Sequence, residues 1–248
     1  MATGRCERLT DRAFMPSWVR REHEARYAFC APYVPRKVVV DCACGEGFGA
    51  VAFAGAGAAV VYAFDRDARA VAVTQARAGA RRILCGVGDA ARLPLPDRIA
   101  DVYVALETLE HLDDDRAFLR EAARVLKPDG LFICSTPNRA VTNPGTALRE
   151  RPGNPFHVRE YAGEQLKTLL GGFFRRVEWY GQHGVSEGTV RLLARLRPLI
   201  SRRGAALASR IHMMPRWWSR RPATHAVQPM RPGAQYEYVI AVCRQPVR

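Results

Sequence analysis

Long apolar runs and paired cysteines are both absent from this sequence of 248 residues. No stretch of about 18 apolar residues is present, which argues against a transmembrane helix. The first residues, MATGRCERLTDR, lack the apolar core of a secretory signal. The seven cysteines include no Cys-x-x-Cys pair, which disfavours a disulfide framework or a zinc site. Reduced thiols are typical of cytoplasmic proteins, and we expect this protein to be cytoplasmic.

Lysine is also scarce, because 35 of the 38 basic residues are arginine. The formal net charge of +14 is unevenly distributed along the chain. Residues 191–248 contain 12 arginines and a single acid, Glu237, whereas the part before them is close to neutral. A protein that is basic over its whole surface is therefore excluded.

The middle of the sequence alternates between apolar runs and helical patterns, which predicts an α/β fold. The run from Val38 to Ala43 is typical of a strand buried on both faces. Asp113 to Asp115 supply acidic helix N-caps, and Lys127 to Gly130 predict the end of that helix. Alternating strands and helices favour a doubly wound, mostly parallel sheet. The expected strands are 38–43, 59–65, 82–88, 100–107, 131–136, 173–181 and 236–244; the expected helices include 67–78 and 161–170.

Candidate binding residues follow the first strand. Ligands bind at the carboxyl ends of parallel strands, and here Asp41 precedes the turn glycines Gly45 and Gly47. Glycines allow close backbone approach to a ligand. An acid before them repels a pyrophosphate but suits an ammonium group, which argues against NAD or FAD. The alternative interpretation is a purely structural strand-to-helix turn.

The ends of the next strands also carry acids. Asp65 lies where a carboxylate accepts hydrogen bonds from ribose hydroxyls, although a helix N-cap is an equally good interpretation. Asp89 is placed to accept from an adenine amino group, and Glu107 ends the fourth strand. Four suitable acids in order are much less expected by chance than any one alone.

These segments together resemble the class I S-adenosylmethionine-dependent methyltransferases, in the small-molecule subgroup near the ubiquinone-biosynthesis type. The matching stretches are VVVDCACGEGFG, VVYAFD, GVGDAARLPLP, ADVYVALETLEHL and REAARVLKPDGLFICSTPN. NPFHVREY, residues 154–161, further resembles methyltransferases found beside or fused to glycosyltransferases. The resemblance implies a Rossmann-like sheet of seven strands with a reversed last hairpin, and S-adenosylmethionine as cofactor.

The resemblance also implies roles for individual residues. Asp41 and the backbone of Ala43, Gly45 and Gly47 would hold the methionine end of the cofactor, and Asp65 would bind the ribose hydroxyls. Arg66, Asp89 and Ala90 would contact the adenine. Glu107 would lie near the methionine end or the substrate. Many relatives have glycine where this chain has Ala43. A methyl group is small, so we expect cofactor binding to survive.

Two histidines are candidates for the base that an alcohol acceptor requires. His111 follows the fourth strand, and His157 lies in the long loop after the fifth. Structural roles for both stay open. We expect no metal ion, because the acidic run at residues 113–115 is explained as a helix start, and Cys42 and Cys44 face opposite sides of a strand.

The predicted organisation has four parts. Residues 1–36 form a helical lid segment, 37–182 the cofactor-binding core, 183–235 a basic insertion that covers the substrate, and 236–248 the final strand. In the insertion, residues 190–197 separate leucines from arginines on a helix that Pro198 interrupts, and residues 211–221 mix tryptophan with arginine. The insertion fits a lid, recognition of an acidic substrate, an anionic membrane surface, RNA phosphates or a dimer contact.

The sequence as a whole predicts methyl transfer to a small-molecule acceptor, a hydroxyl of a sugar, a lipid-linked sugar or a secondary metabolite. Such an acceptor is anionic or lipid-linked if the basic insertion recognises it, with peripheral membrane contact as a further expectation. RNA methylation is the alternative enzyme; against it, the charge is confined to one segment and no RNA-binding module is recognisable. The alternative that is not an enzyme is a scaffold protein that binds S-adenosylmethionine without catalysis.

Overall fold

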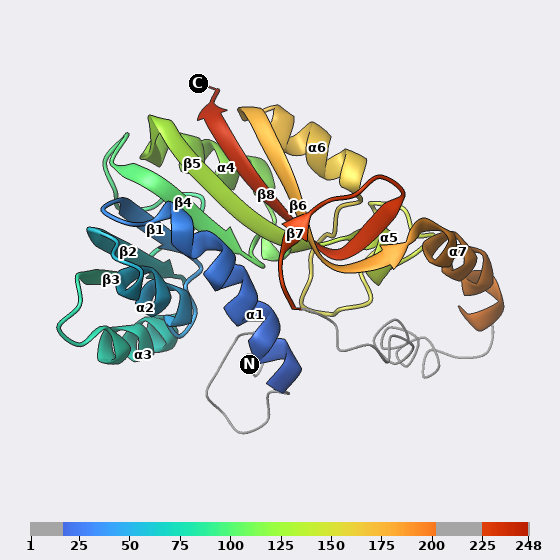
Figure 1. Cartoon of the computed structure of the whole chain (residues 1–248), viewed down its shortest axis with the longest axis horizontal. Coiled ribbons are helices and arrows are strands. Elements are labelled where there is room, and N and C mark those ends of the chain that lie inside the picture. Colours follow the sequence, from blue (N-terminus) through green and yellow to red (C-terminus); the bar gives the residue numbers. More distant parts are fainter. Residues whose placement is uncertain (1–16, 202–224, 248) are drawn as a thin grey trace.

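The computed structural model describes residues 17–201 and 225–247, and its strands form a single sheet (Figure 1). The strands are β1 (Val38–Cys42), β2 (Val60–Asp65), β3 (Ile83–Val87), β4 (Ala100–Leu106), β5 (Leu126–Pro137), β6 (Phe174–Ser186), β7 (Gln228–Pro229) and β8 (Ala234–Pro246). Their order in the sheet is β3-β2-β1-β4-β5-β8-β6-β7. The first five strands are parallel, and β8 lies antiparallel between β5 and β6. The expected doubly wound sheet with a reversed last hairpin is confirmed, and the two-residue β7 makes an eighth strand.

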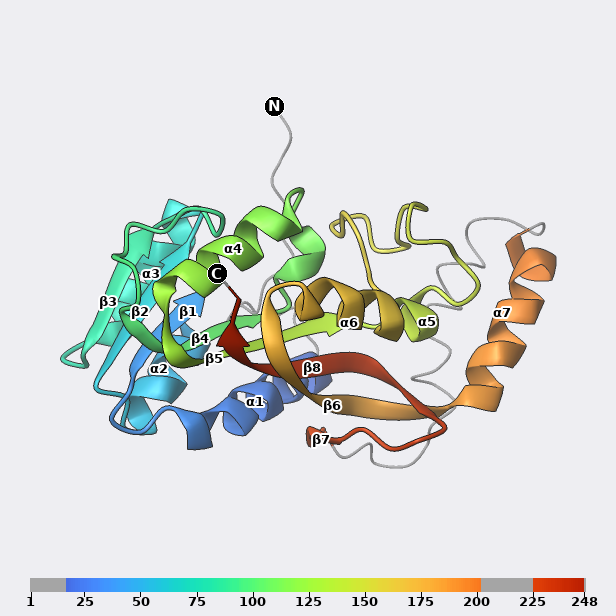
Figure 2. The same cartoon turned by 90° about the horizontal axis from the view of Figure 1, so that it is seen from above.

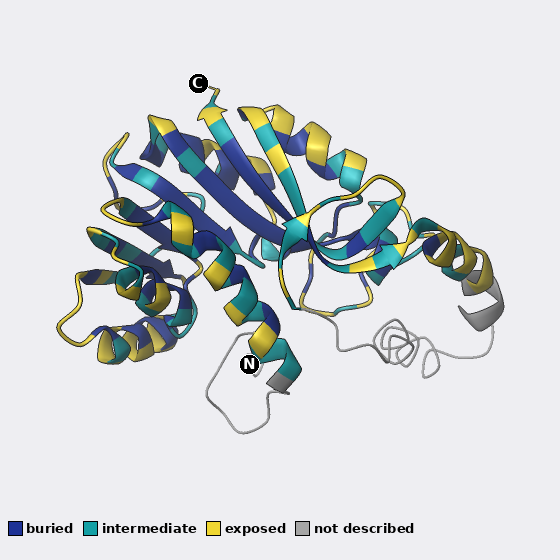
Figure 3. Cartoon of the chain, viewed as in Figure 1, coloured by how far each residue is buried: buried dark blue, intermediate teal, exposed yellow. Residues whose placement is uncertain are grey.

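Helices cover both faces of this sheet (Figure 2). The helices are α1 (Ser17–Cys30), α2 (Phe48–Gly55), α3 (Ala68–Ala78), α4 (Asp115–Val125), α5 (Arg139–Thr142), α6 (Gly163–Gly171) and α7 (Glu187–Ser201), with single 3-10 turns at Ala31–Tyr33 and Leu109–His111. Side chains of α1, α2 and α3 join one apolar core, and those of α4 and α6 join the other. The central strands between the cores are almost entirely buried (Figure 3).

Alternation along β1 shows how the sequence builds both cores. Val39 belongs to the core under α1 and α2, and Val40 to the core under α4. Cys42 and Cys44 are also divided between the two cores, as expected, but not because of their spacing: residues two apart on a strand face the same side. Cys44 lies beyond the end of β1, and Ala43 between the two cysteines has a left-handed φ of +59°. Because both faces are covered, β1 is apolar from Val38 to Val40 instead of alternating with polar residues.

Both ends of α4 agree with the sequence-based expectation, whereas the strand after it begins earlier than expected. The N-cap is Asp114, whose Oδ1 accepts from Ala117 N–H at 2.8 Å, within the expected acidic run. The helix ends at Val125, directly before the expected stop at residues 127–130. The strand β5 was expected to begin at residue 131 but begins at Leu126, which pairs with Ala100, with a register shift between the pairs at Ala100 and Val102.

The basic insertion is described only in part. Residues 211–221 lie outside the described residues, so the predicted tryptophan–arginine surface is not placed. The prediction that Pro198 interrupts the helix is wrong, because α7 continues to Ser201. Proline removes one helical hydrogen bond, and the turns on either side carry the helix through. Leu192 and Leu196 are exposed on α7. Within residues 17–201 and 225–247, no helix combines the length and the apolar character needed to cross a membrane.

Candidate cofactor and acceptor site

Asp41, near the end of β1, is a buried carboxylate with a missing partner. Its side chain is 4% exposed, and Oδ2 has no hydrogen-bond partner among the described residues. Burial and the smaller effect of the nearby Asp65 charge together raise the pKa of Asp41 to about 7, although a hydrogen bond from the Ala50 backbone lowers it. Oδ2 lies against Gly49, where a Cβ atom would come within 2.9 Å of it. A cationic group bound here would supply what this carboxylate lacks.

The turn after β1 adopts left-handed backbone conformations at alternate positions. The φ angles are +59° at Ala43, +55° at Gly45 and +81° at Gly47, and Gly47 is the N-cap of α2. A Cβ atom on Gly47 would lie 2.6 Å from Thr74 Cγ2, whereas one on Gly45 would meet nothing within 4 Å. The turn is therefore packed against α3 at Gly47 and faces open space at Gly45. That open side is where a ligand can approach the backbone.

Asp65 joins the ends of β1 and β2. Its Oδ2 accepts from Gly45 N–H at 3.0 Å and its Oδ1 from Asp67 N–H at 2.9 Å. The N-cap of α3 is Asp67, whose side chain accepts from Arg69 N–H, so Asp65 does not cap that helix. A carboxylate has about four lone-pair sites. Both carboxylate oxygens of Asp65 thus accept from backbone N–H groups, and its role toward ribose hydroxyls stays a prediction.

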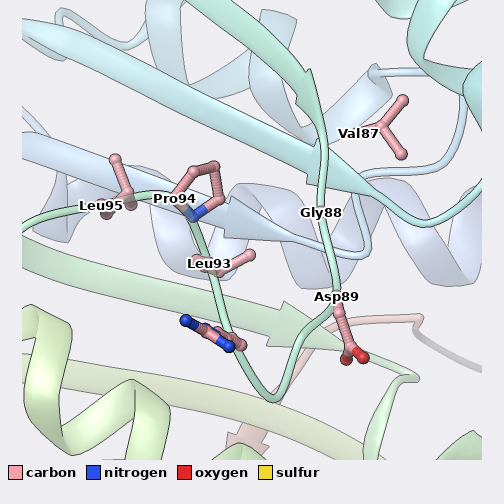
Figure 4. A pocket seen from close by; sticks show the side chains of 7 residues that line it. Val87, Gly88, Asp89, Leu93, Pro94 and Leu95 are labelled. Atoms are coloured by element: carbon pink, nitrogen blue, oxygen red, sulfur yellow. The ribbon is translucent and has the colours of Figure 1, made fainter.

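The end of β3 borders a pocket of about 540 Å³ (Figure 4). Its lining includes Gly88, Asp89, Leu93 and Pro94, with the Asp89 side chain at its rim in the view shown. Asp89 is exposed, and its Oδ1 accepts from Ala91 N–H at 2.9 Å. The apolar wall and the polar rim suit a planar base.

The remaining predicted contacts differ in burial. Ala90, beside Asp89, is half-buried, and Arg66, after β2, is exposed. Glu107 follows β4 with φ +51°, and its Oε1 accepts from the Ser135 hydroxyl of β5 at 2.6 Å. The structure thus places the predicted cofactor residues at the carboxyl ends of adjacent strands. Their contacts with the cofactor stay predictions.

The two histidines, 46 positions apart, are in direct contact. The ring centroids of His111 and His157 are 4.9 Å apart, with the planes at 83°. His111 Nδ1 lies 3.0 Å from the Phe156 carbonyl, which only accepts, so Nδ1 carries the hydrogen and the neutral ring has its lone pair on Nε2. The long loop after β5 is thereby attached to the end of β4.

His157 has hydrogen-bond partners at both ring nitrogens. Its Nδ1 lies 2.6 Å from Glu160 Oε1, and Nε2 lies 3.0 Å from the Asn154 amide nitrogen. Burial opposes ionisation of Glu160, but hydrogen bonds from His157, Thr142 and Asn143 lower the pKa of its carboxyl group. His157 is thus held in the loop through both of its ring nitrogens.

Glu110 lies beneath this histidine pair. It is fully buried, Oε2 accepts from the Thr136 hydroxyl at 3.0 Å, and Oε1 has no partner among the described residues. Burial raises the pKa of Glu110 well above its ordinary value, and Glu107 raises it further. Glu110, His111 and His157 place one potential metal-ligand atom each within 4.8 Å of the others. The hydrogen bonds of His157 compete with such a use.

Several residues of this region did not stand out in the sequence. The ring of Tyr27, on α1, lies against Gly49 and places that helix beside Asp41. Thr74 donates to the Gly45 carbonyl at 2.9 Å, and Ser135 holds Glu107. Each reaches the site from a distant part of the chain, and only the position of Ser135 near a strand end offered a signal.

Comparison with known proteins gives a consistent result. Residues 40–134 match a methyltransferase domain family. A probable S-adenosylmethionine-dependent methyltransferase of Mycobacterium tuberculosis, Rv3030, is 41% identical over 153 residues, which are 62% of this chain and 53% of that protein. The ubiquinone/menaquinone biosynthesis C-methyltransferase UbiE of Caulobacter vibrioides is 52% identical over 68 residues, 27% of each chain. The chain thus spans about half the length of the mycobacterial relative.

The same fold occurs in solved structures. A SAM-dependent methyltransferase of Thermotoga maritima superposes with a TM-score of 0.59, covering 92% of this chain and 94% of that one. The sequence identity is 17%, so this likeness concerns the fold.

Proposed function

Because the chain contains a class I S-adenosylmethionine-dependent methyltransferase domain, we propose that it transfers the methyl group of S-adenosylmethionine to a hydroxyl of a small molecule. The acceptor class is a sugar, a lipid-linked sugar or a secondary metabolite, and the reaction takes place in the cytoplasm. Six free cysteines among the described residues support a reducing compartment.

The observation that carries this proposal is the buried, unpartnered oxygen of Asp41. The methionine part of S-adenosylmethionine has an ammonium group, which fits beside this carboxylate. The open backbone at Gly45 would admit the methionine chain, and Asp65 would bind the ribose hydroxyls. The pocket beside Asp89 would hold the adenine. The residues present therefore fit the cofactor.

The protein has to align the acceptor oxygen with the methyl group more than it has to activate the methyl group. S-adenosylmethionine supplies a methyl group on a positively charged sulfur, which is already electrophilic. Orientation of two reactants in one site is worth about 7–11 kcal/mol. The chain itself must hold the acceptor oxygen in line and remove its proton. His111 Nε2 is the proposed proton acceptor, and His157 positions it through the ring contact.

The loop after β5 supports a small acceptor. Arg139, which is 2% exposed, is surrounded by loop carbonyl oxygens and donates to those of Thr146, Ala147 and Glu150. The loop is thereby folded over the end of the sheet near His157. A closed loop of this kind suits enclosure of a small molecule, which excludes water from the reacting atoms.

Two measurements test the proposal. Calorimetry with S-adenosylmethionine and with S-adenosylhomocysteine is expected to show one site per chain, weakened at least tenfold in Asp65→Ala. Radiolabelled methyl transfer to a panel of sugars, lipid-linked sugars and phenolic or polyketide alcohols is expected to identify the acceptor. An absence of cofactor binding by the parent chain would refute the proposal. Transfer to RNA and to none of the small molecules would refute the acceptor class.

A further inference from the structure

A second cluster of ionisable side chains lies away from the strand ends described above. It combines Glu22 on α1, His183 near the end of β6, and His225 just before β7. Each offers one potential ligand atom, and these atoms all lie within 4.8 Å of one another. Glu22 is 3% exposed, and both histidines are partly buried.

One nitrogen of each imidazole lacks the hydrogen bond that a buried polar atom normally makes. His183 Nε2 and His225 Nδ1 are buried, and neither has a hydrogen-bond partner among the described residues. His183 Nε2 lies 3.2 Å from Glu22 Oε1, although without hydrogen-bond geometry. The ring centroids of the histidines are 5.5 Å apart. Two imidazoles and a carboxylate thus bring one potential ligand atom each within 4.8 Å of the others.

The backbone around the cluster is held in place by Gln182. This residue is fully buried, and its Nε2 donates to the carbonyl oxygens of Glu22 and His225. Its Oε1 accepts from Arg26 at 2.6 Å. The neighbouring His183 has φ +58°, a left-handed conformation that costs energy in a non-glycine residue. Such strain is commonly kept at ligand-holding positions.

We propose that Glu22, His183 and His225 form a binding site for a divalent transition-metal ion, with Zn²⁺ as the ion that fits. Zinc binds imidazole and carboxylate at about 2.0–2.2 Å, and three protein ligands leave a fourth position for water or a substrate oxygen. In a tetrahedral site with such bonds, neighbouring ligand atoms are about 3.3 Å apart. The 3.2 Å separation of His183 Nε2 and Glu22 Oε1 matches this spacing.

The bound ion would connect α1 to β6 and to the residue where the basic insertion returns to the sheet. Glu22 precedes Tyr27 by five residues, about 7.5 Å along the helix, and the ring of Tyr27 lies against Gly49.

The experiment uses untagged full-length protein stripped with a chelator. Titration with Zn²⁺ against a chromophoric chelator is expected to show one tight site per chain, and Co²⁺ is expected to give a spectrum with no sulfur charge-transfer band. Glu22→Gln, His183→Asn and His225→Gln should each lower the affinity more than the 10- to 100-fold caused by loss of a supporting residue. Asparagine tolerates the left-handed backbone, so His183→Asn preserves the local fold.

The matched control is His111→Asn, which removes a histidine from the other three-residue cluster and should bind Zn²⁺ as the parent does. Cofactor calorimetry on every variant verifies folding independently of the metal. Absence of Zn²⁺ binding by the parent, unchanged binding by the three variants, loss of binding only in His111→Asn, or a cobalt–sulfur band would each overturn the proposal.

Discussion

The imidazole rings of His111 and His157 meet edge to face, with centroids 4.9 Å apart. This contact joins the turn after β4 to the loop after β5. It also distinguishes two histidines that the sequence left equal, because Nδ1 of His157 lies beside the Glu160 carboxylate whereas Nδ1 of His111 lies beside the Phe156 carbonyl.

Replacement of His111 is expected to impair the chemical step. We expect His111→Asn to lower kcat by about 10²- to 10⁴-fold, the usual contribution of a general base, since the neighbouring imidazole of His157 is hydrogen-bonded at both nitrogens. The dissociation constant of S-adenosylmethionine should stay within twofold of the parent value by calorimetry. Turnover is measured with the acceptor found in the panel. Equal turnover in parent and variant would exclude His111 as the base.

Replacement of His157 is expected to impair stability first. His157→Gln leaves the buried Glu160 without its imidazole partner, which should cost about 3 kcal/mol of unfolding free energy near neutral pH. The pKa of Glu160 is depressed in the folded state, so this contribution is present above its ordinary value of 4.5 and is lost as the pH falls through the folded-state value. Urea unfolding at several pH values measures it. If the loss of unfolding free energy in His157→Gln grew as the pH fell, the assigned pairing of His157 with ionised Glu160 would be contradicted.

Cofactor affinity is expected to depend on the ionisation of Asp41. With a pKa of about 7 in the free protein, Asp41 must lose its proton to pair with an ammonium group. We expect the affinity to be highest above pH 7 and to fall about tenfold per unit below it, with proton release on binding. Calorimetry in buffers of different ionisation enthalpy detects the proton. Asp41→Asn should bind more weakly, with a flatter profile; a profile as steep as that of the parent would count against Asp41.

Ala43 occupies a backbone conformation that glycine adopts without strain. Its φ of +59° predicts that Ala43→Gly raises the unfolding free energy by about 1 kcal/mol. The control is Ala52→Gly, an exposed position within α2, which should lower it by about 0.5–1 kcal/mol. Denaturant unfolding curves give both changes in unfolding free energy from their midpoints, provided that the dependence of the free energy on denaturant concentration is unchanged. A loss of stability in Ala43→Gly would show that the turn is not strained.

The two turn glycines are expected to respond differently to a methyl group. Gly47→Ala brings a Cβ atom within 2.6 Å of Thr74, which should cost about 1–3 kcal/mol beyond the backbone strain. Gly45→Ala carries similar strain but enters open space, so its main effect should be at least tenfold weaker cofactor binding. Unfolding and calorimetry on both variants separate the effects. Equal stability losses with equal affinities would contradict this division.

The sequence by itself determined the sheet, its parallel part and the acids at the strand ends. Apolar runs, caps and turn glycines are local signals, and parallel strands bring their carboxyl ends to one edge, so Asp41, Asp65, Asp89 and Glu107 were predictable. The exceptions concern the ends of two elements. Leu126 joins β5 because it pairs with Ala100 on the neighbouring strand, and α7 continues past Pro198.

Tertiary structure alone decided which distant residues meet. The loop after β5 could have placed His157 at many positions, and its contact with His111 depends on the hydrogen bonds of Glu160 and Asn154. The grouping of Glu22, His183 and His225 depends on how α1 packs against the last hairpin. No periodicity encodes such contacts, because they arise from the packing of whole elements and not from the spacing of neighbours in the chain.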